Sequence, residues 1–461
     1  MERKNAWKNY TEADLVQVED IAVRYRAFLD EGKTERECVS GAVKLAEAKG
    51  YCDLAAVIKE GKPLQAGDKV YVNVMGKAIC LFHLGSQPLE KGMNIVGAHV
   101  DSPRIDLKQN PLYEDSDFAY MDTHYYGGIK KFQWMAQPLA LHGVVAKKDG
   151  TVVNIVIGDD PADPVIGISD LLIHLSGELM GRKAGEYVNG EQLDIIVGGK
   201  PVQGEEKDAV KTGVLNILKE KYDIEEEDFL SAEIEVVPAG KARDFGLDRS
   251  MILGYGHDDR VCAFAALDAL LSIEGTPEKT CCCLFSDKEE IGSVGATGMQ
   301  ASYFENAVAE LINLTAPAYS DLILRRALAN CSMLSTDVSA GYDPSFAGKF
   351  ERKNTAFLGR GVAFNKYTGS RGKGGSNDAN AEFVAKVRKL MDDAGVYFQT
   401  AELGAVDVGG GGTIAYICAL YGMNVIDSGV PVLNMHAPYE IINKADLLEA
   451  KRGYLAFMLN A

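Results

Sequence analysis

TCCCLFSDKEEIGSVGATG, residues 280–298, is the stretch on which the fold prediction for this chain depends. Residues 281–285 form a short apolar run with the length and composition of a fully buried strand. The run ends in polar residues that lead to two adjacent carboxylates, Glu289 and Glu290, and three glycines then let the backbone turn. Ligand sites in open α/β sheets lie beyond the carboxyl ends of the strands, so both carboxylates are predicted to lie at such a site.

Helical and extended patterns alternate around this strand. An extended run at 251–257 is followed by a strongly apolar helical segment at 261–275, which leads into residue 280. Further helical segments are predicted at 12–29, 35–48, 303–314, 322–329, 379–393 and 413–422, and further extended ones at 69–84 (a hairpin turning at 75–77), 94–98, 333–336, 396–403 and 423–435. This alternation predicts an α/β fold with a doubly wound, mostly parallel sheet.

The character of the chain changes between residues 105 and 240. β-type runs are denser there, at 139–147, 151–158, 193–199 and 232–240. We therefore predict a discontinuous first domain, 1–104 and 241–461, with a β-rich second domain inserted at 105–240. One helical segment is predicted around 169–183, and His174 on its apolar face is interpreted as a core or interface histidine.

Composition excludes several classes of protein. The 461 residues include 47% hydrophobic and 25% charged side chains, as in an ordinary globular enzyme. The formal net charge of −18 argues against nucleic acid or an anionic membrane as a partner, because both would repel the chain. We find neither a membrane-spanning apolar run nor a secretory signal, and expect a cytoplasmic protein whose nine cysteines are reduced thiols rather than zinc ligands.

Polar residues with metal-binding side chains recur where predicted strands end or helices begin. These residues are His99, Asp258, Glu289, Glu290, Asp337 and His436. In a doubly wound sheet such positions converge on one crevice. Nitrogen and oxygen donors without thiolates suit Zn²⁺, Mn²⁺ or Co²⁺. Two histidines with several carboxylates match a pair of metal ions about 3.5 to 4 Å apart that share one carboxylate, which leaves another carboxylate to act as a base.

Three other interpretations stay open at this point. Residues 410–415 (GGGTIA) formally match a dinucleotide-binding turn, with Asp427 downstream, which would indicate an NAD-dependent oxidoreductase. The same metal ligands would also serve a dimetal carboxypeptidase or deacylase. Finally, the carboxylates could be helix caps in a non-enzymatic scaffold.

Five segments together resemble one known family. AHVDSPR (98–104), GHDDR (256–260), FSDKEEIGS (285–293), STDV (335–338) and NMHAPYE (434–440) occur in the order and contexts of motifs in the aspartyl aminopeptidase and aminopeptidase I family of cocatalytic zinc peptidases. The resemblance covers nearly the whole chain. It implies a metalloaminopeptidase that removes the N-terminal residue from peptides with a free N-terminus.

The resemblance also implies a ligand set for two divalent ions, most simply zinc, with cobalt or manganese as alternatives. His99 and Asp337 would hold one ion, Glu290 and His436 would hold the other, and Asp258 would bridge them. These assignments come from the matching motifs.

The remaining roles implied by the resemblance concern proton transfer, orientation and assembly. Glu289 would be the general base, and Asp101, two residues after His99, would orient that imidazole. His174 would reach into the active site of a neighbouring subunit and stabilise the developing oxyanion. The inserted domain would then mediate dimerisation, and six dimers would form a tetrahedral dodecamer.

One segment departs from the family pattern. Many members carry GPVIK followed by Asn, whereas residues 361–367 here read GVAFNKY. The lysine expected to meet an acidic substrate side chain is therefore displaced or absent. Lys366 or Arg371 could substitute, or the pocket could accept neutral or basic side chains.

Overall fold

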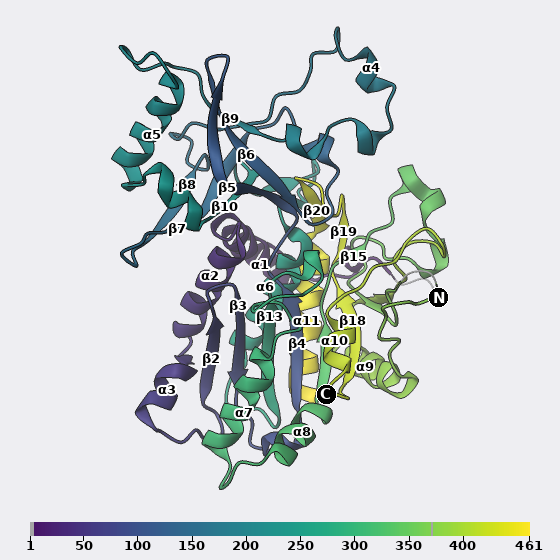
Figure 1. Cartoon of the computed structure of the whole chain (residues 1–461). Helices are drawn as coiled ribbons and strands as arrows, with labels where there is room; N and C mark the ends of the chain where they lie inside the picture. The colour runs from purple at the N-terminus through teal and green to yellow at the C-terminus, as the bar shows by residue number, and fades with distance from the viewer. Residues whose placement is uncertain (1–3, 370–371) are drawn as a thin grey trace. The chain divides into compact units, whose positions relative to one another are not determined.

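The computed structural model describes residues 4–369 and 372–461. The described chain forms two compact units (Figure 1). Unit 1 comprises the residues up to Asp101, Ala242–Met435 and Glu440–Ala461, and unit 2 comprises Ser102–Lys241 and His436–Tyr439.

Unit 1 contains a nine-stranded sheet in the order β1-β2-β3-β13-β4-β14-β18-β16-β17. Its strands are β1 (Cys52–Asp53), β2 (Lys69–Val74), β3 (Ala78–His83), β4 (Met93–His99), β13 (Thr280–Ser286), β14 (Ser332–Ser335), β16 (Val362–Asn365), β17 (Phe398–Thr400) and β18 (Asn424–Gly429). Five of the eight strand pairs are parallel and three are antiparallel, so the predicted mostly parallel α/β sheet is confirmed.

The apolar run that opened the sequence analysis is β13, which lies between β3 and β4 (Figure 1). All seven of its residues are buried. Cys281, Cys283 and Phe285 face one hydrophobic core, whereas Cys282 and Leu284 face the other. Because successive side chains point to opposite faces, a strand buried on both faces must be apolar at every position.

Helices cover both faces of this sheet. The first core includes residues of α1 (Glu12–Glu31), α2 (Glu35–Glu47), α6 (His257–Leu271), α9 (Ala381–Asp393) and α11 (Lys444–Asn460). The second includes residues of α3 (Leu54–Glu60), α7 (Tyr303–Thr315), α8 (Asp321–Ala329) and α10 (Ala415–Ala419). Helices on both faces are what a doubly wound sheet requires.

A second sheet of unit 1 was not predicted. It has the order β11-β12-β20-β19-β15, with β11 (Arg243–Phe245), β12 (Met251–Gly254), β15 (Ser339–Ala340), β19 (Pro431–Leu433) and β20 (Glu440–Asn443). The extended run predicted at 423–435 is thus divided between two sheets. At the end of β18, a Cβ atom on Gly429 would lie 1.7 Å from the carbonyl oxygen of Asp337, so only glycine fits there.

Unit 2 contains a six-stranded antiparallel sheet in the order β8-β7-β10-β5-β6-β9. Four strands match predicted runs: β7 (Leu139–Ala146), β8 (Val152–Ile157), β9 (Ile195–Gly198) and β10 (Ala232–Pro238). The sequence analysis missed the long strands β5 (Arg104–Asp115) and β6 (Phe118–Tyr126) and the helix α5 (Ala209–Tyr222). Unit 2 is nevertheless β-rich, as expected.

The helix predicted around 169–183 is wrong for most of its length. Only α4 (Gly177–Met180) is helical there, and His174 lies in a turn in which the Leu175 amide donates to the Leu172 carbonyl. Helical stability in proteins comes mainly from packing an apolar face, and the apolar side chains of this segment are exposed within the described chain. No helix among the described residues is long and apolar enough to cross a membrane.

Candidate metal centre

Three neighbouring parallel strands of unit 1 end at the same edge of the large sheet. Ser286 at the end of β13 pairs with His99 at the end of β4, and Ser335 at the end of β14 pairs with Gly97. Because the strands are parallel and in register, the residues that follow them meet at that edge. The register of these strands therefore accounts for part of the predicted convergence of the candidate ligands.

His99 is the buried centre of this group. Its Nε2 atom lies 3.2 Å from a carboxylate oxygen of Asp258 and 3.8 Å from one of Asp337, yet it makes no hydrogen bond to any residue that the structure describes. Its Nδ1 atom lies 2.9 Å from the carbonyl oxygen of Asp101 and 3.3 Å from a carboxylate oxygen of the same residue. An imidazole held through Nδ1 with Nε2 directed at carboxylates has the arrangement of a metal ligand.

The charges around His99 act on its protonation. Burial opposes the charged imidazolium, but the carboxylates of Asp101, Asp258 and Asp337 outweigh it and raise the pKa of His99 well above 6.5. A divalent cation at Nε2 would replace that proton. The site therefore provides the negative charge that a cation requires.

Asp258, in the non-helical first turn of α6, lies at the same place. The backbone amide of Asp258 donates to the carboxylate of buried Glu440, at 2.9 Å, and the amide of His99 donates to buried Asp259, at 3.3 Å. The Asp258–Asp259 peptide bond is cis. The sequence analysis missed Glu440 and Asp259 as supporting residues, although both lie within the quoted motifs.

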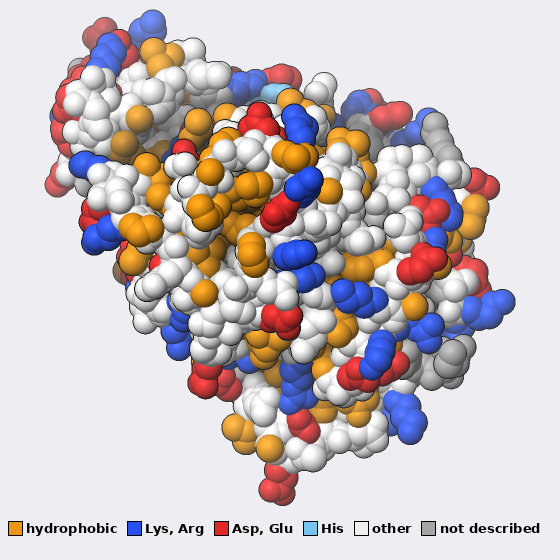
Figure 2. All heavy atoms as spheres, turned by 90° about the horizontal axis from the view of Figure 1, so that it is seen from below, with side chains coloured by type: hydrophobic (Ala, Val, Ile, Leu, Met, Phe, Trp, Pro, Cys, Tyr) orange, Lys and Arg blue, Asp and Glu red, His pale blue; other side chains and the backbone are white. Residues whose placement is uncertain are grey.

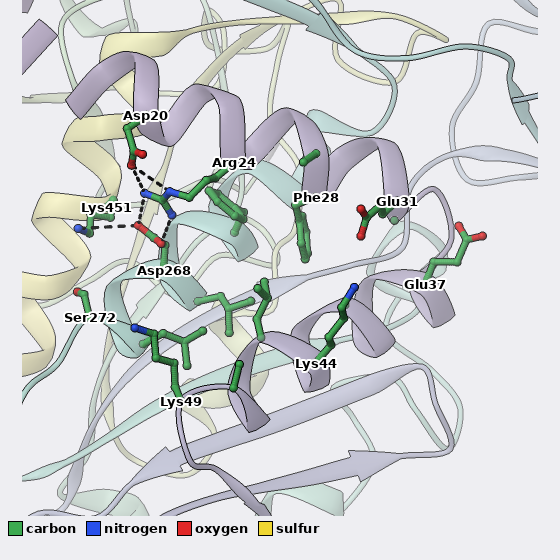
Figure 3. Close-up of a pocket in the computed structure, with 18 residues that line it drawn as sticks. Asp20, Arg24, Phe28, Glu31, Glu37, Lys44, Lys49, Asp268, Ser272 and Lys451 are labelled. Atoms are coloured by element: carbon green, nitrogen blue, oxygen red, sulfur yellow. Dashed lines mark hydrogen bonds and ion pairs between the residues drawn. The ribbon is translucent and has the colours of Figure 1, made fainter. Parts of the chain in front are cut away.

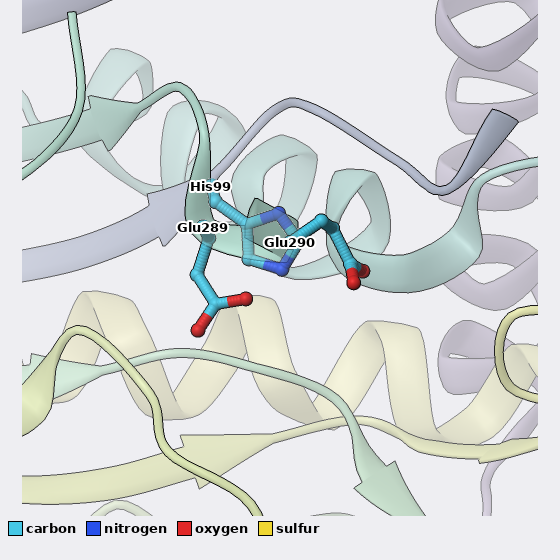
Figure 4. Close-up of side chains that lie close together, drawn as sticks. All are labelled: His99, Glu289 and Glu290. Atoms are coloured by element: carbon cyan, nitrogen blue, oxygen red, sulfur yellow. The ribbon is translucent and has the colours of Figure 1, made fainter. Parts of the chain in front are cut away.

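Glu289 and Glu290 lie in a short 3₁₀ helix, Glu289–Ile291, after β13. Each offers an oxygen within 4.8 Å of a His99 nitrogen, and in the view of Figure 4 they extend on opposite sides of the imidazole ring. Their backbone amides donate to the two oxygens of Asp101, each at 3.2 Å. Asp101 is thus a positioning residue for both glutamates as well as for His99.

Burial and neighbouring acids also act on the protonation of Glu289, whose side chain is half-buried. Burial, followed by the negative charge of Asp337, raises its pKa to about 8 in the metal-free chain. A cation nearby would lower that value.

The donor set can hold metal ions. His99, Asp258 and Asp337 offer ligand atoms within 4.8 Å of one another, and so do His99, Glu289 and Glu290. Asp258 and Glu290 also offer oxygens within 4.8 Å of each other. Imidazole nitrogen with carboxylate oxygens suits zinc and similar divalent ions, so the residues present fit the metal expected.

The two remaining predicted histidines belong to unit 2. His436 lies between β19 and β20, in the segment His436–Tyr439 of unit 2, and its Nδ1 atom lies 2.9 Å from the carbonyl oxygen of Gly128. Since a carbonyl only accepts, Nδ1 carries the proton and Nε2 carries the lone pair that can bind a metal. His174 is exposed, with four large apolar neighbours, Leu171, Leu172, Ile173 and Leu175, also exposed.

Lys366, one candidate for the displaced lysine, already has an acidic partner. Lys366 forms an ion pair with Asp378, whose other oxygen lies 3.0 Å from Lys373. Arg371 lies outside the described residues. Lys366 therefore meets a substrate carboxylate only in competition with Asp378.

Two of the other motifs have structural explanations. Eight of the nine cysteines are buried, where they pack as small hydrophobic side chains, and Cys52 is exposed. Asp427, expected downstream of a dinucleotide-binding turn, is buried in β18 and accepts a hydrogen bond from Thr413 at 2.5 Å. That carboxylate holds the glycine turn rather than being available to a ribose.

The fold and the donor set together define an α/β protein with a candidate metal centre of the kind that metal-dependent hydrolases use. The sequence profile of one family, the aminopeptidase I zinc metalloproteases (M18), matches residues 28–458. The chain belongs to this family, so the resemblance seen in the sequence is confirmed. It is therefore a metal-dependent aminopeptidase.

Individual relatives agree with this assignment. A probable M18 family aminopeptidase 1 from Clostridium acetobutylicum is 55% identical over 460 residues, covering 100% of this chain and 98% of the relative. The crystal structure of an M18 aminopeptidase from Thermotoga maritima has a TM-score of 0.95 at 46% identity, with 100% of both chains covered. The Saccharomyces cerevisiae mApe1 dodecamer shares the fold, with a TM-score of 0.77, 21% identity, and 96% and 97% of the two chains covered.

Proposed function

We propose that this aminopeptidase holds two divalent ions, most simply zinc, through the residues predicted from the sequence. His99 and Asp337 would bind one ion, and Glu290 and His436 the other. Asp258 would bridge them, which is supported by its oxygens lying near both the His99 nitrogen and a Glu290 oxygen. When bound, the ions would supply positive charge that polarises the scissile carbonyl and acidifies water.

Glu289 would be the general base of the reaction. It would take a proton from the water that attacks the scissile carbonyl of a peptide with a free N-terminus, and then pass that proton to the leaving amine. The observation that carries this role is the position of the half-buried Glu289 carboxylate, which offers an oxygen within 4.8 Å of both a His99 nitrogen and a Glu290 oxygen. Asp101 would keep Glu289 in place through its hydrogen bond to the Glu289 amide.

The decisive experiment separates metal binding from proton transfer. We expect Glu289→Gln to retain its metal ions while turnover of an aminoacyl-nitroanilide falls by about 10²- to 10⁴-fold, the usual contribution of a general base. Metal content by mass spectrometry and kcat are measured on the same sample. Unchanged turnover would remove Glu289 from this role, and loss of metal would make it a ligand instead. A carboxypeptidase or deacylase would hydrolyse a substrate with a blocked N-terminus equally well.

His174 would complete the site of a neighbouring subunit by stabilising the oxyanion. Its exposure beside four exposed apolar side chains supports a role outside its own subunit. We expect His174→Phe to lower kcat by about 10²- to 10³-fold with metal content intact, as for the loss of one oxyanion donor. His124→Phe, which changes another exposed histidine of unit 2, should have little effect. Full activity in the His174 variant would contradict a shared site.

Two chains would associate through unit 2 to form a dimer, and six such dimers would assemble into a tetrahedral dodecamer in the cytoplasm. Support comes from the exposed apolar segment and from a yeast structure of the same fold that is described as a dodecamer.

A further inference from the structure

The turn between His99 and Asp101 positions most of the candidate metal centre. Strand β4 ends at His99, and the buried Val100 follows it. The Val100 amide donates to the carbonyl oxygen of Ser286, at 2.9 Å, which ties the turn to the end of β13. Since the Asp101 carboxylate accepts hydrogen bonds from the amides of both glutamates, a shift of this turn would move the imidazole and the glutamates together.

Arg260 reaches this turn from α6, and its side chain is completely buried. The Nε atom donates to the carbonyl oxygen of Val100, at 3.3 Å, and an Nη atom donates to the carbonyl oxygen of Lys33, at 2.7 Å. The guanidinium also lies over the buried ring of Tyr255, with its central carbon 5.2 Å from the ring centroid. One side chain therefore joins the turn beside His99 to the connection between α1 and α2.

Such burial is unusual for an arginine. On the face drawn in Figure 2, Lys and Arg side chains lie at the surface, interspersed with Asp and Glu. Arg24 on α1 is likewise exposed and forms ion pairs with Asp20 and Asp268 (Figure 3). Removing a charged group from water is costly, so charged side chains are rarely buried completely. The burial of Arg260 beside the candidate ligands indicates that its hydrogen bonds matter for the structure there.

The second anchor of Arg260 is itself fixed. Lys33 lies between α1 and α2, and its amide and the Thr34 amide both donate to the Glu37 carboxylate, at 2.9 and 3.0 Å. The Thr34 hydroxyl accepts from the Glu37 amide in return, at 3.1 Å, which completes a capping box at the start of α2. The Lys33 carbonyl is therefore a fixed point from which Arg260 can hold the Val100 carbonyl.

The shape of a guanidinium suits this task. Its donors lie in one plane at fixed angles, so the bond to the Lys33 carbonyl also fixes the direction of the Nε bond to Val100. A lysine carries a single ammonium on a flexible stem, so it cannot set two directions at once. An apolar side chain of similar length would fill the space but hold neither carbonyl.

We propose that Arg260 is a positioning residue for the candidate metal centre. It would hold the Val100 carbonyl, and through the backbone of the turn it would fix the imidazole of His99 and the carboxylate of Asp101. Arg260 would act through these residues rather than as a ligand. The inference rests on the ligand assignment proposed above, in which His99 binds a metal ion.

The first experiment uses the full-length metal-free protein and therefore needs no bound ion. Hydrogen exchange, measured by mass spectrometry, reports how readily backbone amides open locally. We expect Arg260→Met, which keeps the length of the side chain and loses its donors, to speed exchange around residues 99–101 and 32–34, while β2 exchanges as in the parent. Faster exchange throughout unit 1 would show that Arg260 stabilises the fold in general, and would overturn the proposal.

The second experiment measures the metal site directly, with Co²⁺ as the probe. Zinc has a filled d shell and no visible spectrum, whereas Co²⁺ in its place absorbs visible light according to its ligand geometry. We expect Arg260→Met to weaken Co²⁺ binding about 10- to 100-fold, the usual effect of losing an outer hydrogen-bond partner, and to shift the absorption bands. Arg260→Lys keeps one donor group and should recover part of the affinity. Arg24→Met should leave the affinity and the spectrum unchanged.

A matched pair of helix caps tests the anchor without changing Arg260, and decides the proposal even where Arg260→Met does not fold. Thr34→Ala removes the capping hydroxyl at the start of α2, next to Lys33, whereas Thr11→Ala removes the equivalent hydroxyl at the start of α1. Only Thr34→Ala should speed exchange around residues 99–101 and weaken Co²⁺ binding, by less than Arg260→Met does. Equal behaviour of the two cap variants would contradict the anchor.

The proposal also fails if Arg260→Met keeps the exchange rate of the parent around residues 99–101, or its Co²⁺ affinity and spectrum. His99→Ala distinguishes this failure from a failure of the ligand assignment. If His99→Ala keeps the Co²⁺ spectrum of the parent, the assignment fails and the role of Arg260 fails with it. If His99→Ala loses that spectrum while Arg260→Met keeps it, only the role of Arg260 fails.

Discussion

The sheet edge of unit 1 and the apolar turn around His174 in unit 2 depart from ordinary burial in opposite ways. At the edge, His99 and Asp258 are buried together with nearby acids. In the turn, Ile173 and Leu175 are 68% and 67% exposed. Buried charge is costly without a counter-charge, and clustered exposed apolar side chains mark a contact surface. The first region therefore favours a bound cation, and the second favours contact with another protein surface.

The strongest test of the first half of this comparison is Asp258→Ala. If Asp258 bridges both ions, both should be lost, and turnover should fall beyond the roughly 10- to 100-fold typical of outer-shell residues. Metal analysis after gel filtration, with kcat/KM on the same sample, checks this. Asp268→Asn, near the other end of the same helix, is the matched control and should retain both ions. Retention of one ion by Asp258→Ala would show that the carboxylate is not shared.

The second half of this comparison, the exposed apolar turn around His174, is tested by adding negative charge to that turn. Ile173→Asp with Leu175→Asp should weaken subunit association by about 3 kcal/mol or more, roughly a hundredfold in the dissociation constant, because two apolar contacts are lost. Sedimentation velocity measures the change. Leu230→Asp alters another exposed leucine of unit 2 and serves as the control. An unchanged assembly would mean that the turn faces solvent in the oligomer.

The smallest expected effect concerns the free-energy cost of burying an acid, Asp427, beside the sheet edge. Burial, followed by the charge of Asp337 and against the hydrogen bond from Thr413, raises the pKa of Asp427 to about 7, from an ordinary value of 3.8. The folded chain therefore favours the protonated acid: this contribution to stability is complete below the ordinary value and is lost as the pH rises to about 7.

Asp427→Asn in the metal-free protein should remove that dependence. The fall in the free energy of unfolding between pH 5 and pH 7 should become about 1 to 2 kcal/mol smaller than in the parent. Urea unfolding at both pH values measures it. The exposed Asp393→Asn provides the control, and equal slopes in parent and Asp427 variant would contradict the raised pKa.

The sheet and its ligand-bearing edge could be predicted because local pattern and topology agree there. β13 is apolar at every position and ends in acids, and a parallel sheet brings such ends together. β5 gave no such signal, since polar side chains occur through much of it and only part of it is buried. Its position depends on pairing with β10, which is distant in sequence, and with β6, with which its register is irregular.

The supporting residues were harder to predict than the ligands. Glu440 acts through the backbone amide of Asp258, 182 residues away. Nothing in the sequence around Glu440 indicates that contact. The prediction of a helix around His174 was wrong for the converse reason, because the apolar side chains of this segment stay exposed among the described residues instead of packing against another element.

The Glu289 and Glu290 amides each donate a hydrogen bond to the Asp101 carboxylate, and these two bonds span nearly 190 residues of chain. Neither glutamate is held in its position until β4 has paired with β13. Loops of this length close late, since their entropy must be lost before any contact rewards it. Uptake of metal during refolding would therefore report that β4 and β13 have paired.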